Sequence, residues 1–234
     1  MLKQVRNNLF YFYKNSIKSI LLFWSIYLFF IGVLVVITFL AGGSAQFVGV
    51  NIIPSFIFTI VFSILFFKDT FPFVIKYGTN RHSYFISLVV FTILYSIGMT
   101  LLSLLTTTVI VQIIEIFNIN NFSFLGLHES FHIPVTMMEV SIFEALLYGV
   151  FFFLSSCIAV VFYRFGYLLG AIFIAPFIAM FFFPKIVESL IEIGKFFAIG
   201  HDQYNVGAYF ILYTIFSLIL WLLIRNASIL DRTK

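Results

Sequence analysis

The stretch KDTFPFVIKYGTNRH, residues 68–82, is the longest polar interruption between two apolar segments in the first half of the chain. Its lysines and arginine predict a cytoplasmic loop, because basic residues accumulate on that side of a membrane. The stretch also keeps the aromatic side chains Phe71, Phe73 and Tyr77, which water does not favour. We therefore expect it either to be covered by a partner protein or to lie against lipid headgroups, where aromatic rings are also stable.

The composition around this stretch is that of a membrane protein. Of the 234 residues, 62% are hydrophobic and 9% are charged, which excludes the ordinary water-soluble classes. Six apolar segments are long enough to cross a bilayer, which takes roughly 20 helical residues each. They cover approximately residues 20–40, 52–67, 83–111, 142–163, 166–183 and 207–224. The sequence predicts an all-α fold, residues 1–234 forming one transmembrane domain.

The distribution of basic residues predicts the orientation of these spans. Eleven of the thirteen lysines and arginines fall before the first span, in residues 68–82, in the turn after the fourth span, or after the last span. Only Lys185 and Lys195 fall in segments assigned to the opposite side. An imbalance of this size predicts a multi-pass protein of the plasma membrane with both termini in the cytoplasm.

Three further segments lie outside the predicted spans. Residues 1–19 carry Leu2, Val5, Leu9 and Phe12 at helical spacing, which is typical of an amphipathic helix lying in the membrane interface. Residues 112–141 form the largest predicted extracellular segment, and residues 184–206 form another. The second one begins with Pro184 and carries an apolar stripe, which predicts a short surface or re-entrant helix.

The segment 112–141 contains the pattern H-E-x-x-H as His128, Glu129 and His132. On a helix this spacing places two zinc ligands on one face, with a glutamate beside the metal-bound water. Pro134 disfavours helical geometry at the residue before it, and Gly126 precedes the motif, so a polar loop is the competing interpretation. No spacing places a third ligand, and we expect neither a metal site nor a catalytic residue here.

The third predicted span carries hydroxyl groups on one helix face, at Thr92, Ser96, Thr100, Ser103 and Thr107. Such stripes commonly serve helix packing in membranes, and lining a translocation path is the alternative. No ionisable residue lies well inside a span, since Glu144 and Arg164 fall near opposite ends of the fourth. This pattern argues against proton- and ion-coupled carriers, which depend on buried charge.

The sequence lacks the motifs of two other functions, ATP binding and nucleic-acid binding. The phosphate-binding pattern G-x-x-x-x-G-K-[ST] does not occur in the sequence, so the chain cannot bind ATP by that route. No nucleic-acid-binding module is recognisable, and the net charge of +4 is explained by membrane orientation.

The whole chain resembles the small permease subunits of bacterial ABC exporters of the second type, whose fold is shared with the eukaryotic G-subfamily half-transporters. The likeness is carried by the amphipathic segment before the first span, the six spans, and the stretch YGTNRHSYF at residues 77–85. That stretch is similar to the family's glycine, small or polar, basic and aromatic pattern. The segment before the last span and the ending Arg225, Asn226, Ala227 also agree. Exporters of peptides and peptide antibiotics in Gram-positive bacteria look most similar.

The resemblance implies that residues 68–82 are a coupling helix that docks on a separate ATPase. The residues expected to meet the ATPase are Asp69, Phe71, Phe73, Tyr77, Gly78 and Arg81. ATP and magnesium would bind the partner ATPase dimer, with no cofactor on this chain, and a second permease, identical or paralogous, would complete the transporter. The second and fifth spans line the path in the family. Candidate path or gate residues here are Thr100, Ser103, Thr107, Phe181, Phe182 and Phe183, with lipid contact as the alternative for the three phenylalanines.

The expected function is export of amphipathic peptides, lipids or hydrophobic antibiotics, because spans without buried charge offer hydroxyl, aromatic and aliphatic surface. Two functions from other classes stay open. One is an intramembrane zinc peptidase that uses His128, Glu129 and His132. The other is a non-catalytic membrane sensor or assembly protein.

Overall fold

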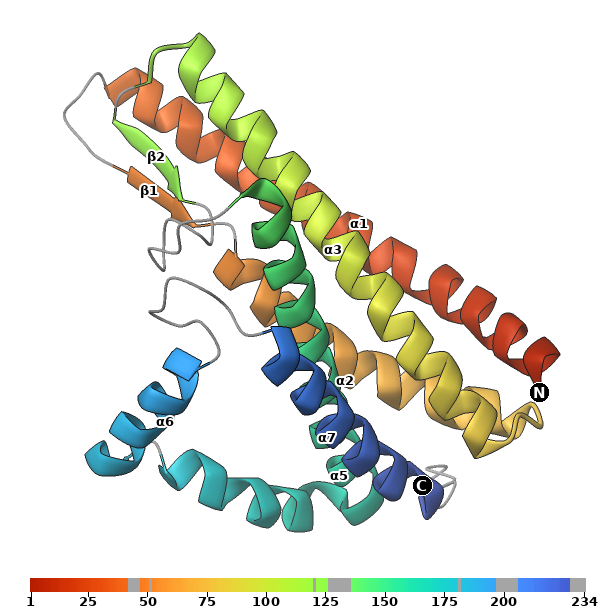
Figure 1. Ribbon diagram of the computed structural model, residues 1–234. Helices are drawn as coiled ribbons and strands as arrows, with labels where there is room; N and C mark the ends of the chain where they lie inside the picture. Colours follow the sequence, from red (N-terminus) through yellow and green to blue (C-terminus); the bar gives the residue numbers. More distant parts are fainter. Residues whose placement is uncertain are drawn as a thin grey trace.

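The computed structural model describes residues 1–41, 47–50, 52–119, 121–125, 136–180, 182–196 and 206–227. Nearly all of this part of the chain is helical (Figure 1). The elements are α1 (Leu2–Ala41), β1 (Phe47–Val50), α2 (Ile52–Lys76), α3 (Arg81–Ile116), β2 (Phe122–Leu125), α5 (Met137–Met180), α6 (Pro184–Phe196) and α7 (Val206–Arg225).

Five helical segments in the described part are long and apolar enough to cross a membrane. They are α1, α2, α3, the Met137–Gly166 part of α5, and α7. The outward sides of these helices carry exposed large apolar residues, for example Phe29 on α1 and Phe210 on α7. Water would disfavour such a surface, whereas lipid tails would not. The chain is therefore a helical membrane protein, as the composition predicts.

The fifth predicted span, residues 166–183, is not confirmed. Gly166 has φ 78° and ψ 175°, a backbone region that is open essentially to glycine alone. Helix α5 bends there instead of making the predicted reversal at Arg164, and its second half leads sideways to α6 (Figure 1). The helix ends at Met180, so this second half is shorter than the roughly 20 residues that a bilayer requires.

The N-terminal segment also differs from the expectation. Residues 1–19 do not form a separate interfacial helix, because α1 runs without a break from Leu2 to Ala41. Its first half buries Asn8, Phe12 and Ser16. The Phe12 ring meets Tyr84 and Phe91 of α3 edge-on, with centroids 5.6 Å apart in both pairs. The apolar spacing in residues 1–19 therefore reflects packing against α3.

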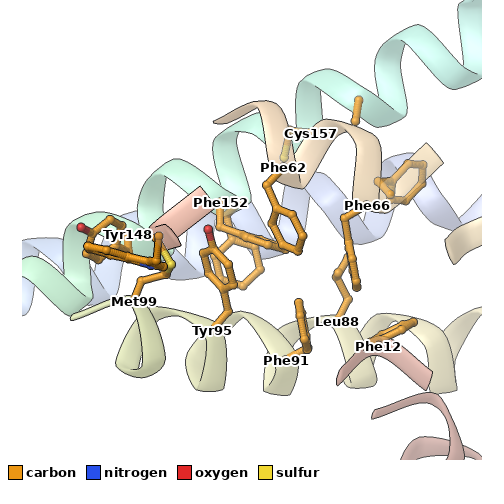
Figure 2. Close-up of a cluster of buried hydrophobic side chains, with 14 of the residues drawn as sticks. Phe12, Phe62, Phe66, Leu88, Phe91, Tyr95, Met99, Tyr148, Phe152 and Cys157 are labelled. Carbon is orange, nitrogen blue, oxygen red and sulfur yellow. The ribbon is translucent and has the colours of Figure 1, made fainter. Parts of the chain in front are cut away.

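The core is aromatic and lies between α2, α3 and α5 (Figure 2). Phe66 stacks on Phe91 with centroids 4.7 Å apart, and Phe62 stacks on Tyr95 at 5.1 Å. Phe152 of α5 contacts both pairs. Pairs of this kind contribute about 0.5–1.5 kcal/mol each beyond the burial of their area, so the rings hold the three helices in one arrangement.

Two short strands, which the sequence analysis did not predict, close the end of the bundle opposite the N-terminus (Figure 1). β1 and β2 pair in parallel, with Phe47 opposite Phe122 and Val50 opposite Leu125. Gly49 lets the Phe124 ring approach the backbone of β1, where an added Cβ would lie 2.7 Å from that ring. The short helix α6 begins at Pro184, as expected of a proline in a first helical turn.

Candidate functional site

The turn between α2 and α3 contains the residues that the resemblance singles out. Only residues 77–80 are non-helical here, because α2 continues through Lys76. The predicted loop over residues 68–82 is therefore mostly helix. Lys68 and Asp69 are exposed while Thr70 and Phe71 are buried, so the charges that marked a loop lie on the outward side of a helix.

The turn itself is built by two residues. Gly78 has φ +82°, the left-handed conformation that glycine adopts at helix ends, and its N–H donates to the Ile75 carbonyl. Asn80 then caps α3, its side-chain oxygen accepting the Ser83 N–H at 2.7 Å. The glycine and the polar residue of the YGTN stretch therefore specify a tight turn.

Phe71 is not available to a partner, which corrects its assignment as a docking residue. Its side chain is 0% exposed. The ring lies 5.2 Å from Tyr84 and 5.4 Å from Tyr163, edge-on in both pairs. Phe71 is part of the core because it lies on the inward side of α2, three residues before the buried Val74.

An aromatic patch is exposed at the same turn, formed by Tyr11, Phe73 and Tyr77. The Phe73 ring stacks on Tyr11 with a centroid distance of 4.5 Å and an interplanar angle of 12°, and it lies 4.5 Å from the Tyr77 ring. Phe73 is 40% exposed and Tyr77 is 77% exposed. Asp69 and Gly78 are also exposed. Tyr11 belongs to α1 and was not predicted to take part.

Hydrogen bonds hold α1 and α7 to this turn. Asn8 Nδ2 donates to Ser87 Oγ at 3.1 Å, and Asn8 Oδ1 accepts from Thr79 Oγ1 at 3.3 Å. Arg81, another predicted docking residue, donates from Nη1 to the carbonyl of Arg225 at the end of α7, at 2.6 Å. The patch therefore lies at an end of the bundle where hydrogen bonds connect α1, α3 and α7.

A second region, which we call the polar network, lies inside the bundle between α2, α3 and α5. The hydroxyls of Ser55 and Tyr148 share a hydrogen bond of 2.7 Å. Ser103 hydrogen-bonds to both Tyr148 and Glu144. The side chain of Glu144 is 4% exposed, and its Oε2 has no hydrogen-bond partner among the described residues.

Glu144 is the functional candidate that the sequence analysis missed. It was placed near the end of a span, but α5 begins at Met137. Glu144 therefore lies about 10 Å along the helix at about 1.5 Å per residue. The available signal was the four-residue spacing of Glu144 and Tyr148, repeated at Ser55 and Thr59 on α2, which places polar groups one above the other on a helix face.

The structure separates the predicted path residues into two groups. Thr100 and Ser103 are buried, and Thr107 is half-buried, with its Oγ1 bonded to the Ser103 carbonyl at 3.0 Å. Phe182 and Phe183 are exposed between α5 and α6, and residue 181 lies outside the described residues. Of these residues, Ser103 belongs to the polar network through its hydrogen bonds to Glu144 and Tyr148, and the role of all of them as a path stays a prediction.

A pocket of about 400 Å³ adjoins this network between α1, β1 and the start of α2. Its walls are apolar side chains of α1, together with Val48, Gly49 and Pro54. Tyr27 also lines it and is buried, and no described residue forms a hydrogen bond with its hydroxyl. Two lining residues connect the pocket with the polar network, because Pro54 directly precedes Ser55 and Tyr27 interacts electrostatically with Tyr148.

His128, Glu129 and His132 lie outside the described residues, and the zinc hypothesis stays untested. Within the described part of the chain, no group of three histidine, cysteine, aspartate or glutamate side chains is placed to hold a metal ion.

The aromatic patch and the polar network are thus two separate candidate sites, one at an end of the bundle and one inside it. No protein-family model, no curated protein and no solved structure matches this chain, so both sites are interpreted from their own chemistry.

Proposed function

We propose that the chain is a permease subunit of an ATP-driven exporter in the plasma membrane, and that its aromatic patch docks on a separate ATPase. The observation that supports this most strongly is the exposed stack of Tyr11, Phe73 and Tyr77. Aromatic residues are enriched at the centres of protein interfaces, where they contribute much of the binding energy. This stack also lies beside the glycine and basic residues that the exporter family uses for coupling.

The charge at this end of the bundle supports a cytoplasmic location for the patch. Lys3, Arg6 and Lys14 of α1 are exposed, as are Lys76 and Arg225. The hydrogen bonds from Ser83 Oγ to Gln4 Oε1 and from Arg81 Nη1 to the Arg225 carbonyl bring the ends of α1, α3 and α7 together. Both termini would then face the cytoplasm, where basic residues are retained.

The rest of the proposed transporter follows the family's organisation. Two permeases, identical or paralogous, would pair in the lipid bilayer on an ATPase dimer that holds ATP and magnesium. A movement of the patch during ATP binding would pass to α1 and α7 through the hydrogen bonds at the turn. The substrates would be amphipathic peptides, lipids or hydrophobic antibiotics.

The competing explanation for the patch is contact with lipid headgroups, which also accommodate aromatic rings. The test is purification of the chain from its native membranes in mild detergent, identification of any ABC ATPase that co-purifies, and measurement of ATP hydrolysis. We expect the intact chain to retain the ATPase, and Tyr77→Ala to lose it. Tyr13→Ala is the matched control, because Tyr13 is an exposed α1 tyrosine outside the patch. Equal retention by both variants would favour the headgroup explanation.

A further inference from the structure

The carboxyl of Glu144 is the starting point, because its surroundings leave it uncompensated. Of the acidic and basic side chains in the described residues, Glu144 alone is buried. Within the part of the chain that the structure describes, one of its oxygens has no hydrogen-bond partner, while Ser103 supplies a hydrogen bond to the group. A buried carboxylate without a positive partner is costly, and ionisable residues inside membrane proteins commonly mark a ligand path.

The groups around Glu144 are suited to a cation. The polar side chains connected to it are hydroxyls, at Ser103, Tyr148 and Ser55, and these can orient oxygen atoms toward positive charge. Aromatic faces adjoin the same region, since Phe56 packs edge-on against Tyr148 with centroids 5.0 Å apart. Aromatic faces attract organic cations, especially where water is excluded.

The adjoining pocket supplies room for an apolar body. Its volume is about 400 Å³, and its lining residues Phe23, Phe30 and Ile31 are apolar. Tyr27 lines this apolar volume and interacts electrostatically with Tyr148 of the polar network. A ligand with an apolar body and one positive charge would therefore find complementary surfaces in adjacent places.

We propose that Glu144, Tyr148 and Ser103, together with the pocket lined by Tyr27, bind a lipophilic cation: the positive group lies at the Glu144 carboxyl and the apolar body lies in the pocket. This deepens the proposed export function by naming a substrate class, and it depends on that function only for the direction of transport. A metal ion fits the site poorly, because hard cations take six or more oxygen ligands in most protein sites.

The test uses the full-length chain purified in a non-ionic detergent and two probes of the same shape, tetraphenylphosphonium and tetraphenylborate. Equilibrium dialysis measures the binding of each. We expect saturable binding of the phosphonium at least tenfold tighter than binding of the borate. Glu144→Gln keeps the size of the side chain and one acceptor oxygen and removes its charge, so it should weaken phosphonium binding at least tenfold. Glu139→Gln, an exposed position on the same helix, should leave it unchanged.

A second variant keeps the proposal testable if Glu144→Gln fails to fold. Leu34 of α1 also lines the pocket. Leu34→Trp fills the pocket and leaves the carboxyl in place, and it too should weaken phosphonium binding at least tenfold. Equal binding of the two probes, or undiminished phosphonium binding in the folded variants, would overturn the site. Phosphonium binding without capture of an ATPase would support the cation site and contradict the proposed exporter function. Capture of the ATPase without phosphonium binding would support the exporter function and contradict the cation site.

Discussion

The aromatic patch and the polar network place side chains in opposite and equally unfavourable surroundings. The patch exposes apolar rings at a turn, where Tyr77 is 77% exposed, and the network buries a carboxyl, Glu144, at 4% exposure. Neither arrangement is what folding alone would select, since burial of apolar groups and solvation of charged groups both lower the free energy. Side chains that break a local rule in this way are expected at functional sites. The comparison therefore distinguishes residues that hold the bundle together from residues that we propose meet a partner or ligand.

The largest expected effect is on the free energy of unfolding, and it distinguishes two phenylalanines of α2, the buried Phe71 and the exposed Phe73. Phe71→Ala should lower the free energy of unfolding by about 3–5 kcal/mol, because it leaves a cavity among Tyr84, Tyr163 and Phe67. Phe73→Ala removes a half-exposed ring and should cost about 1 kcal/mol or less. Denaturant unfolding in mixed micelles measures both. Similar losses in the two variants would mean that Phe73 belongs to the core and that the patch is not a free surface.

The second prediction tests whether the aromatic patch contributes to ATPase binding rather than to stability. Tyr77→Ala should weaken association with the ATPase by about 2 kcal/mol, the usual cost of truncating an aromatic anchor. The unfolding midpoint should stay unchanged, because Tyr77 is largely exposed. Titration of the labelled ATPase into reconstituted permease measures the affinity. A lower midpoint with unchanged affinity would assign Tyr77 to stability.

A smaller effect tests whether the polar network acts as a unit. Ser55→Ala removes the 2.7 Å partner of the Tyr148 hydroxyl and should cost about 1.5 kcal/mol of unfolding free energy. Tyr148→Phe should cost a similar amount, and the double variant should cost less than the sum of the two. Denaturant unfolding of the unmodified protein, the two single variants and the double variant provides this double-mutant cycle. Strict additivity would show that the two hydroxyls are not coupled.

The smallest effect concerns the turn that carries the patch. Asn80→Ala removes the oxygen that accepts the Ser83 N–H and should cost about 1 kcal/mol, the usual value for a helix cap. The loss should be local, so hydrogen exchange should increase at the first turn of α3 before it increases at Tyr95 or Met99. Asn80→Asp keeps an acceptor and serves as the control. A uniform increase throughout α3 would show that the cap affects the whole bundle.

Much of the fold could be predicted from the sequence because lipid selects long apolar segments, and five of the six expected spans have a counterpart in the described helices. The errors have local causes. Lys68 and Asp69 indicated a loop, but an exposed helix side accommodates charge equally well. The bend at Gly166 depends on a backbone angle that composition does not reveal. The four-residue strands are too short to give a clear alternating pattern.

The candidate sites were predictable to different extents. Phe73 and Tyr77 could be found because aromatic residues are conspicuous beside charged ones, but the contribution of Tyr11 depends on a contact between residues 62 positions apart. Glu144 was overlooked because the start of its helix set its depth, and that start lies at Met137, beyond the predicted span. Its connection to Ser55 depends on the packing of three helices, which no single segment encodes.

The pairing of β1 with β2 also constrains how the chain is threaded through a bilayer. Hydrogen-bonded strands must share one face of the membrane, and the path from Val50 to Phe122 runs through α2 and α3. That path must therefore cross the membrane an even number of times, whichever face the strands occupy. With one crossing each in α1, α2 and α3, the N-terminus and the turn at Gly78 share the opposite face. A single crossing added between Val50 and Phe122 would leave the two strands on opposite faces, and the sheet could not form.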